Sequence, residues 1–313
     1  MARTVSIVTY HFVRTPDRSP FPRIKARRTD EFRTQVELIR QRCHPISVED
    51  LLAALADPAV ELPERAVVLT FDDGYADHHR TAAPILTDLG LRAAFFVPAM
   101  PVVERTVLQV NKIQFVLAAA TEDEVLRRVL AEIDAHRPAA GIPDPRPLWD
   151  ANAVANRFDT AGVRFVKQTL QSALPRDVRE DIVDRLFAQL VTADESAFAE
   201  ELYMGADDVR ALRDAGMAIG AHGWAHQWMD TLAPGDQQRE IDLSRRFLRS
   251  LGVAEDPWTM CYPYGRWDSS LVDLLAADDC AAAFTVEPRI ADLDRDAALR
   301  LPRLDTNDLP VRR

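Results

Sequence analysis

Two adjacent carboxylates, Asp72 and Asp73, are the first residues in the chain whose types could do chemistry. They follow a short apolar run at residues 67–71, and Gly74 comes directly after them. The run is typical of a buried strand in a parallel sheet, and glycine allows the chain to turn sharply behind it. The pair should therefore stand at the carboxyl end of a strand, where α/β folds build their sites. A simple Asp-Asp-Gly turn without function would have the same composition.

Two histidines, His222 and His226, stand four residues apart after a second apolar run at residues 217–219. This spacing allows both imidazoles to face one metal ion, although two hydrogen-bonded core histidines would show the same pattern. One carboxylate and two imidazoles leave coordination positions open for water and substrate, and the pKa of the water falls towards ~7. The predicted chemistry is metal-assisted hydrolysis. A third apolar run ends in a Pro-Tyr-Gly turn at residues 263–265.

The order of these motifs resembles that of the polysaccharide deacetylase family, also called the NodB-homology or carbohydrate esterase 4 family. The motifs are TFDDG at residues 70–74, HGWAH at residues 222–226 and YPYG at residues 262–265. The Thr-Tyr-His sequence at residues 9–11 also looks like the start of many members.

The resemblance implies a role for each motif residue. Asp73, His222 and His226 would hold one divalent metal ion, with zinc as the expected ion, and Asp72 would be the base that takes a proton from water. The backbone N–H of Tyr264 would stabilise the oxyanion that develops on the acetyl carbonyl. A plain turn with packed aromatic rings is the alternative for the tyrosine-containing motif.

The sequence departs from the family pattern at two places. Many members have an arginine three residues before this tyrosine, where it orients the base, but this chain has Cys261 there. Arg303 is the expected replacement because it is a permanent cation at the end of a late strand, although a surface salt bridge is equally compatible with it. The C-terminal Leu-x-His motif that supplies the general acid is also missing, since no histidine follows His226.

His11 is the expected general acid, the group that protonates the departing amine. It ends the first predicted strand, and parallel strands bring their carboxyl ends to one face, so it should neighbour Asp72 and Asp73. An imidazole has an unperturbed pKa of ~6.5, which suits proton delivery near neutral pH. His78 is the main rival donor, and His11 could instead only form a hydrogen bond with Asp72.

Composition predicts a cytoplasmic protein that does not bind nucleic acid. The 313 residues include 38 basic and 49 acidic ones, a net charge of −11, which argues against nucleic-acid or anionic-membrane partners. The first eleven residues lack the basic and apolar parts of an export signal, and no apolar run is long enough to span a bilayer. Three widely spaced cysteines indicate reduced thiols.

Strand and helix patterns alternate along much of the chain, which favours parallel βαβ units. Together with the resemblance, this predicts an α/β fold, a distorted (β/α)7-type barrel. The predicted strands lie at residues 5–12, 67–71, 92–97, 217–221, 258–262, 281–286 and 300–304, and predicted helices include residues 30–42, 78–89, 207–215, 236–251 and 269–277.

Residues 1–313 are predicted to form a single barrel domain in which residues 100–204 are a helical insertion. This insertion lies outside the resemblance and contains two apolar helical stripes, at residues 125–133 and 182–190, without a catalytic motif. Such stripes need a partner surface. The insertion could pack on the barrel, wall the substrate cleft or join two copies of the chain in a homo-oligomer.

The predicted function is metal-dependent hydrolysis that removes an N-acetyl group from an amino sugar or a glycan intermediate. Three alternatives remain open at this point. The chain could be a C–N hydrolase for a small non-sugar amide, or a catalytically silent carbohydrate-binding barrel. It could also be an iron oxygenase, because two histidines and one carboxylate also suit Fe(II).

Overall fold

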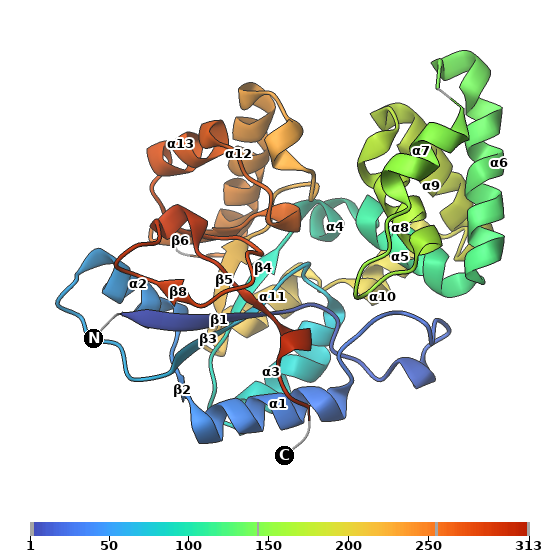
Figure 1. Ribbon diagram of the computed structural model, residues 1–313. Helices are drawn as coiled ribbons and strands as arrows, with labels where there is room; N and C mark the ends of the chain where they lie inside the picture. The colour runs from blue at the N-terminus through green and yellow to red at the C-terminus, as the bar shows by residue number, and fades with distance from the viewer. Residues whose placement is uncertain (1–2, 143, 254–255, 312–313) are drawn as a thin grey trace. The chain divides into compact units, whose positions relative to one another are not determined.

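The computed structural model describes residues 3–142, 144–253 and 256–311 and contains a mixed β-sheet that is flanked by helices (Figure 1). The strands in these ranges are β1 (Thr4–Tyr10), β2 (His44–Pro45), β3 (Ala66–Phe71), β4 (Ala94–Val97), β5 (Ala218–Ala221), β6 (Trp258–Cys261), β7 (Cys280–Phe284), β8 (Ala291–Asp292) and β9 (Leu304–Asp305). The α-helices are α1 (Thr29–Arg42), α2 (Val48–Ala56), α3 (Ala83–Asp88), α4 (Ala99–Glu104), α5 (Gln109–Ala119), α6 (Glu122–Ala140), α7 (Pro145–Asn152), α8 (Ala161–Gln168), α9 (Arg176–Leu190), α10 (Glu195–Leu202), α11 (Ala206–Asp214), α12 (Pro234–Ser250) and α13 (Ser269–Ala277).

The strands follow one another across the sheet in the order β7-β6-β5-β4-β3-β1-β8, with β2 paired to β3 and β9 paired to β1. All pairs from β1 to β7 along this path are parallel, and only β8 is antiparallel to its neighbour. Parallel neighbours require crossover connections, which the helices between them provide. This arrangement confirms the predicted distorted (β/α) barrel.

A short segment at residues 301–305 pairs with both β7 and β1, the outermost strands of the parallel part of the sheet. Leu301 forms a parallel bridge with Phe284 at the end of β7, and β9 pairs with β1 through Leu304 and Asp305. The predicted strand at residues 300–304 is therefore present only as this bridge and the two-residue β9. Because it lies between β7 and β1, the segment can direct a side chain into the barrel.

The two faces of the sheet carry separate hydrophobic clusters, because successive residues of a strand point to opposite faces. On one face, Phe71 stacks between Tyr10 and Phe95, with ring centroids 5.1 and 4.8 Å away. On the other face, Phe96 packs against Phe284 with centroids 5.2 Å apart. Burying each of these rings contributes about 1.5–3 kcal/mol to stability.

Several predicted boundaries differ from those in the structure. The predicted helix at residues 78–89 begins as a π-helix at His78–Ala82 and continues as α3, and the predicted strand at residues 281–286 ends at Phe284. Strands β2 and β8 were not predicted because two residues are too short to show a hydrophobic period. No helix in the described ranges is both long and apolar enough to cross a membrane.

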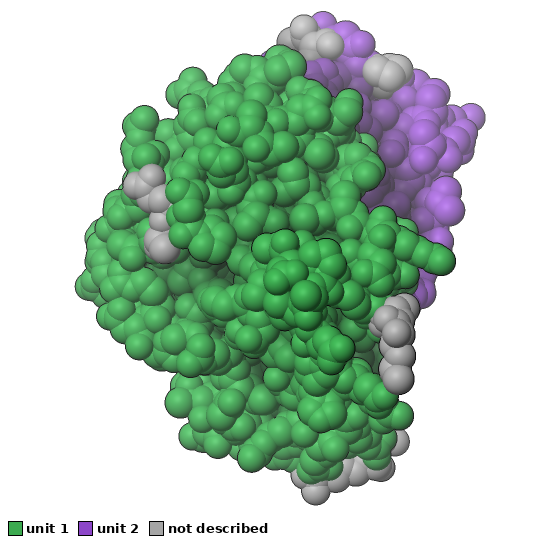
Figure 2. Space-filling view, turned by 90° about the vertical axis from the view of Figure 1, so that its left-hand side faces the viewer, with its two compact units in different colours: residues 1–15, 26–105, 200–313 green, residues 16–25, 106–199 purple. Residues whose placement is uncertain are grey.

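The chain separates into two compact units, residues 1–15, 26–105 and 200–313, and residues 16–25 and 106–199 (Figure 2). The first contains the sheet. The described part of the second consists of helices and connecting segments without a strand. It also includes residues 16–25, which lie outside the predicted insertion. The single barrel domain with an insertion at residues 100–204 stays a prediction.

A buried lysine forms ion pairs between helices of the second unit. Lys112 on α5 forms ion pairs with Asp184 on α9 at 2.7 Å and with Glu195 at 2.8 Å. Residues 16–25 join this unit through Phe21, whose ring meets that of Phe115 edge-on. These contacts involve neither the predicted catalytic residues nor the predicted metal ligands.

Candidate active site

Most of the predicted site residues follow the carboxyl ends of parallel strands, whereas Arg303 directly precedes β9. Asp72 follows β3 directly. Because alternate residues of a strand point to the same face of the sheet, Asp72 lies on the face of Val68. Val68 belongs to the hydrophobic cluster that also contains Cys261 and Leu301. Arg303 is two residues beyond Leu301 and is fully buried. The sheet therefore brings a carboxylate, a thiol and a guanidinium group from three strand ends to one interior face.

The metal ligands predicted from the sequence converge on one point. The Oδ1 atom of Asp73 is 3.3 Å from Nε2 of His222 and 3.3 Å from Nε2 of His226, and all three side chains are buried. No hydrogen-bond partner for this Oδ1 atom was found among the described residues. A buried carboxylate oxygen that faces two imidazole nitrogens is the donor set that a divalent ion such as zinc prefers.

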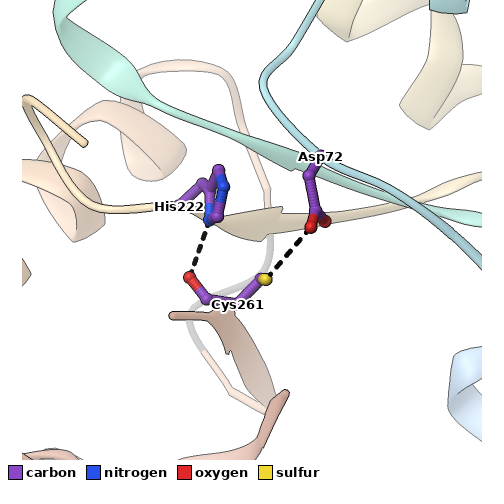
Figure 3. Close-up of side chains that lie close together, drawn as sticks. All are labelled: Asp72, His222 and Cys261. Atoms are coloured by element: carbon purple, nitrogen blue, oxygen red, sulfur yellow. Dashed lines mark hydrogen bonds between the residues drawn. The ribbon is translucent and has the colours of Figure 1, made fainter. Parts of the chain in front are cut away.

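Neighbouring groups fix two of these ligands. The Nδ1 atom of His222 lies 2.8 Å from the carbonyl oxygen of Cys261, to which it donates (Figure 3). This bond leaves Nε2 as the ring nitrogen that faces Asp73. The hydroxyl of Tyr75 donates to Oδ2 of Asp73 at 2.6 Å. Such outer contacts are usual around metal ligands: both fix the orientation of the ligand, and the bond that His222 donates also raises the basicity of its imidazole. The residues present therefore fit a metal centre.

Asp72 and Arg303 form a buried bidentate ion pair. The two terminal guanidinium nitrogens lie 2.9 and 2.6 Å from the two carboxylate oxygens of Asp72. The remaining N–H groups of Arg303 donate to the carbonyl of Thr285, the hydroxyl of Thr70 and the sulfur of Cys261. Since all five donors of the guanidinium have acceptors, the side chain has one defined position. Its burial contradicts the alternative of a surface salt bridge.

This pairing sets the ionisation state of Asp72. Burial alone would raise the pKa of the carboxyl group, but the charge and hydrogen bonds of Arg303, together with the nearby His222, hold the pKa below its usual range. Asp72 is therefore ionised at neutral pH.

Asp72, His222 and Cys261 form a second group of possible ligands in the same region (Figure 3). Both carboxylate oxygens of Asp72 already accept from Arg303, and the Cys261 sulfur also accepts from it. A cation at this point would lie against the guanidinium charge. Burial also raises the pKa of the Cys261 thiol, which disfavours the thiolate. The group around Asp73 is the better metal site.

The two candidate acids have different environments. The side chain of His11 is 48% exposed, and its Nε2 atom is 4.0 Å from Oδ2 of Asp72, so the expected proximity is present. His78 is fully buried, and its Nε2 atom lies 2.9 Å from the backbone carbonyl oxygen of His11. Burial lowers the pKa of His78 to about 4. His78 is thus placed to support the His11 backbone and not to deliver protons at neutral pH.

Tyr264 lies in the short helix η5 (Pro263–Gly265) after β6. Its φ of 57° and ψ of 9° are left-handed, and its ring centroid is 4.7 Å from that of His226. Asp73 and His226 also have positive φ values, 75° and 52°. Such conformations cost about 1–3 kcal/mol at a non-glycine residue and are concentrated at functional sites. Three of the predicted site residues share this feature.

The sequence did not reveal three residues that contact the site. Tyr75 holds Asp73, and the hydroxyl of Thr9 lies 3.3 Å from Asp72. Glu240 on α12 accepts two hydrogen bonds from the loop between the histidines. Two of them had a local signal: Tyr75 stands two residues after Asp73 in the same turn, and Thr9 begins the Thr-Tyr-His motif at residues 9–11.

Comparisons with solved structures show similar folds, all at low sequence identity. The Streptococcus pyogenes deacetylase PplD in complex with acetate is 15% identical, with 97% of this chain and 93% of that chain covered and a TM-score of 0.61. IcaB from Ammonifex degensii is 16% identical, with 98% and 93% covered and a TM-score of 0.57. The BpsB deacetylase domain from Bordetella bronchiseptica is 14% identical, with 97% and 96% covered and a TM-score of 0.56. These likenesses concern the fold.

A sequence model of one family identifies the chain more directly. No match was found among curated proteins. The model described as polysaccharide deacetylase matches residues 59–132 and 175–283, more than half of the chain, including both aspartates and both histidines of the site. The chain therefore belongs to the polysaccharide deacetylase family.

Proposed function

We propose that this protein is a metal-dependent hydrolase that removes the acetyl group from an N-acetylated amino sugar or glycan intermediate. The observation that carries the proposal is the pairing of two buried arrangements: the ligand set of Asp73, His222 and His226, and the adjacent Asp72–Arg303 ion pair. Membership of the polysaccharide deacetylase family supports the sugar-type substrate. We further propose, from the sequence, that the metal ion is zinc and that the protein is cytoplasmic.

The proposed mechanism separates metal binding from base catalysis. A divalent ion held by Asp73, His222 and His226 would polarise the acetamide carbonyl and acidify a water molecule. Asp72 would take the proton from that water. Oδ1 of Asp72 accepts from Arg303 and has a second lone pair for this proton, whereas Oδ2 also accepts from Thr9 and Cys261. Because Arg303 makes the carboxylate a weak base, proton transfer depends on the acidification of the water.

The other residues act on the acetamide group. The backbone N–H of Tyr264 would donate to the developing oxyanion, and the left-handed conformation of this residue would set its direction. His11 would protonate the departing amine, since its side chain is partly exposed and close to Asp72. Both roles are proposals from family resemblance and position.

The Asp72–Arg303 pair also bears on the other predicted functions. A buried ion pair is often less stabilising than apolar residues of the same volume, so a silent carbohydrate-binding barrel would have no need of it. A spare base next to a metal ligand serves hydrolysis and has no evident role in an iron oxygenase. A hydrolase of small non-sugar amides would need the same residues and differs only in substrate.

The test is to measure bound metal and acetate release with the purified protein. The substrates are N-acetyl sugars, nucleotide-linked N-acetyl sugars, N-acetylated oligosaccharides and a simple acetamide without a sugar. We expect acetate release from at least one sugar substrate, with loss on chelation and recovery on addition of zinc. Acetate release from the simple acetamide alone would contradict the sugar substrate and favour a hydrolase of small non-sugar amides. Acetate release that resists the chelator would contradict metal dependence.

A further inference from the structure

The loop between the two histidines, residues 223–225, has a dedicated partner on helix α12. The backbone N–H groups of Trp224 and Ala225 both donate to Oε2 of Glu240, at 2.8 and 3.0 Å. The Glu240 side chain is buried, with a relative exposure of 7%. Hydrogen bonds to an ionised carboxylate are stronger than neutral ones, and burial strengthens them further.

The same loop is fixed from its opposite side by the start of helix α4. Its carbonyl oxygens at Gly223 and Trp224 accept from the backbone N–H groups of Ala99 and Met100, at 3.2 and 2.9 Å. Helix α4 therefore holds the carbonyl groups of the loop and Glu240 holds its N–H groups. The loop backbone has little freedom to rotate while both sets of hydrogen bonds persist.

Gly223 allows the loop to come this close to the carboxylate. Its φ is +71°, and a Cβ atom placed on it would lie 3.3 Å from Oε2 of Glu240 and 3.3 Å from Cγ of Pro263. Any other residue would be strained in this conformation and would crowd both neighbours. The close contact between the loop and Glu240 therefore requires both the glycine at position 223 and the carboxylate on α12.

The two histidines at the ends of this loop are oriented in different ways. His222 is fixed directly, because its Nδ1 atom donates to the carbonyl of Cys261. The Nδ1 atom of His226 has no hydrogen-bond partner among the residues that the structure describes. A metal-binding imidazole usually has its second nitrogen fixed by such a partner. His226 therefore depends for its orientation on ring contacts with His222 and Tyr264 and on its own backbone. That backbone directly follows Trp224 and Ala225, whose N–H groups bond to Glu240.

We propose that Glu240 is a positioning residue for the metal centre, which acts through the 223–225 backbone to hold Nε2 of His226 against Asp73. The inference rests on the proposed function in assuming that Asp73, His222 and His226 bind a metal ion. It predicts that loss of the carboxylate weakens metal binding more than it weakens the fold.

The experiment compares Glu240→Ala, Glu240→Gln and a control, Ser244→Ala, in the full chain. Ser244 is also buried on α12, one turn further along, but its hydroxyl donates to the backbone carbonyl of Glu240 and not to the loop, so its removal leaves the Glu240 carboxylate in place. Zinc affinity is measured by titration of the metal-free protein against a competing chelator. Thermal unfolding of the metal-free proteins gives a separate measure of the fold.

Glu240→Ala should weaken zinc affinity about 10- to 100-fold, the usual effect of losing an outer-shell partner. Glu240→Gln keeps an oxygen acceptor without the charge, so its loss should be smaller. Ser244→Ala should keep the wild-type affinity even where its unfolding temperature falls as far as that of Glu240→Ala. This pattern would separate positioning of the ligand from general support of the fold.

Unchanged affinity in Glu240→Ala, or equal losses in all three variants, would overturn the inference while leaving the proposed metal site intact. If Glu240→Ala does not fold, the comparison of Glu240→Gln with Ser244→Ala decides, and equal affinities would refute the inference. Failure of the wild-type protein to bind zinc would remove the proposed metal centre and this inference together.

Discussion

The Asp72–Arg303 ion pair can be tested through its effect on stability, independently of any substrate. The substitution Arg303→Met keeps an unbranched side chain of similar length but removes all five donors. Asp72 would then remain buried, with the hydroxyl of Thr9 at 3.3 Å, the thiol of Cys261 at 3.4 Å and Nε2 of His11 at 4.0 Å among its polar neighbours. Removing one partner of a buried pair typically costs about 3–5 kcal/mol. We expect the free energy of unfolding to fall by that amount near neutral pH.

The pH dependence of this loss has a definite sign. In the wild-type protein, Arg303 lowers the pKa of Asp72 below its unfolded value of ~3.9. The stability that Asp72 contributes is therefore present above that value and is lost as pH falls through the lower folded pKa. In Arg303→Met, burial without a cation raises the pKa instead. The deficit of the variant should be largest near neutral pH and should shrink as the carboxyl group becomes protonated.

The assay is urea unfolding of the metal-free wild type, Arg303→Met, Asp72→Asn and the double variant at pH 7.5 and pH 5.5. The double variant should regain most of the lost stability, because asparagine carries no charge to leave uncompensated. A double variant as unstable as Arg303→Met, with the same deficit at both pH values, would show that the loss comes from a packing defect. That result would refute the electrostatic argument.

Three further predictions concern the other site residues. The substitution Asp72→Asn should keep the metal, measured by elemental analysis, and lower acetate release ~10²- to 10⁴-fold, the usual effect of losing a general base; near wild-type activity with metal present would exclude Asp72 as the base. The double variant His222→Ala, His226→Ala should lose stoichiometric metal, and one zinc equivalent retained after dialysis against chelator would contradict the ligand assignment. His11→Ala should slow hydrolysis of substrates with poor leaving groups far more than those with good ones, and equal losses on both would argue against a general acid.

Much of the fold could be predicted because most of its helices and strands are long enough to show a periodic spacing of apolar residues. Helix α1 buries Phe32, Val36 and Ile39, the face that the sequence pattern predicted. The carboxyl end of β3 was predicted from an apolar run that stops at two carboxylates and a glycine. The two-residue strands carry no such pattern, because their positions depend on partners far along the chain. The π-helix that begins at His78 likewise has no local sequence signal.

The site was predictable where spacing or charge identified a residue. His222 and His226 share a short motif, and Arg303 was the cation at a late strand end. The exclusion of His78 as an acid needed its burial and its bond to the His11 carbonyl, which depend on packing. Glu240 could not be found from the sequence, because it is one of several acidic residues on a helix. Only the placement of that helix brings its carboxylate to the loop of residues 223–225.

The positions of Cys261 and Arg303 show why the departure from the family pattern is compatible with the proposed function. Both residues flank Asp72 on the interior face, and the guanidinium group lies 2.9 Å from the Cys261 sulfur. An arginine at position 261 would bring a second cation into the space that Arg303 already occupies. A small, neutral thiol leaves that space open and also accepts one of the five guanidinium hydrogen bonds. The residue types at positions 261 and 303 therefore depend on each other. The carboxylate of Asp72 needs one guanidinium partner in a fixed place, and in this chain the segment 301–305 supplies that guanidinium instead of β6.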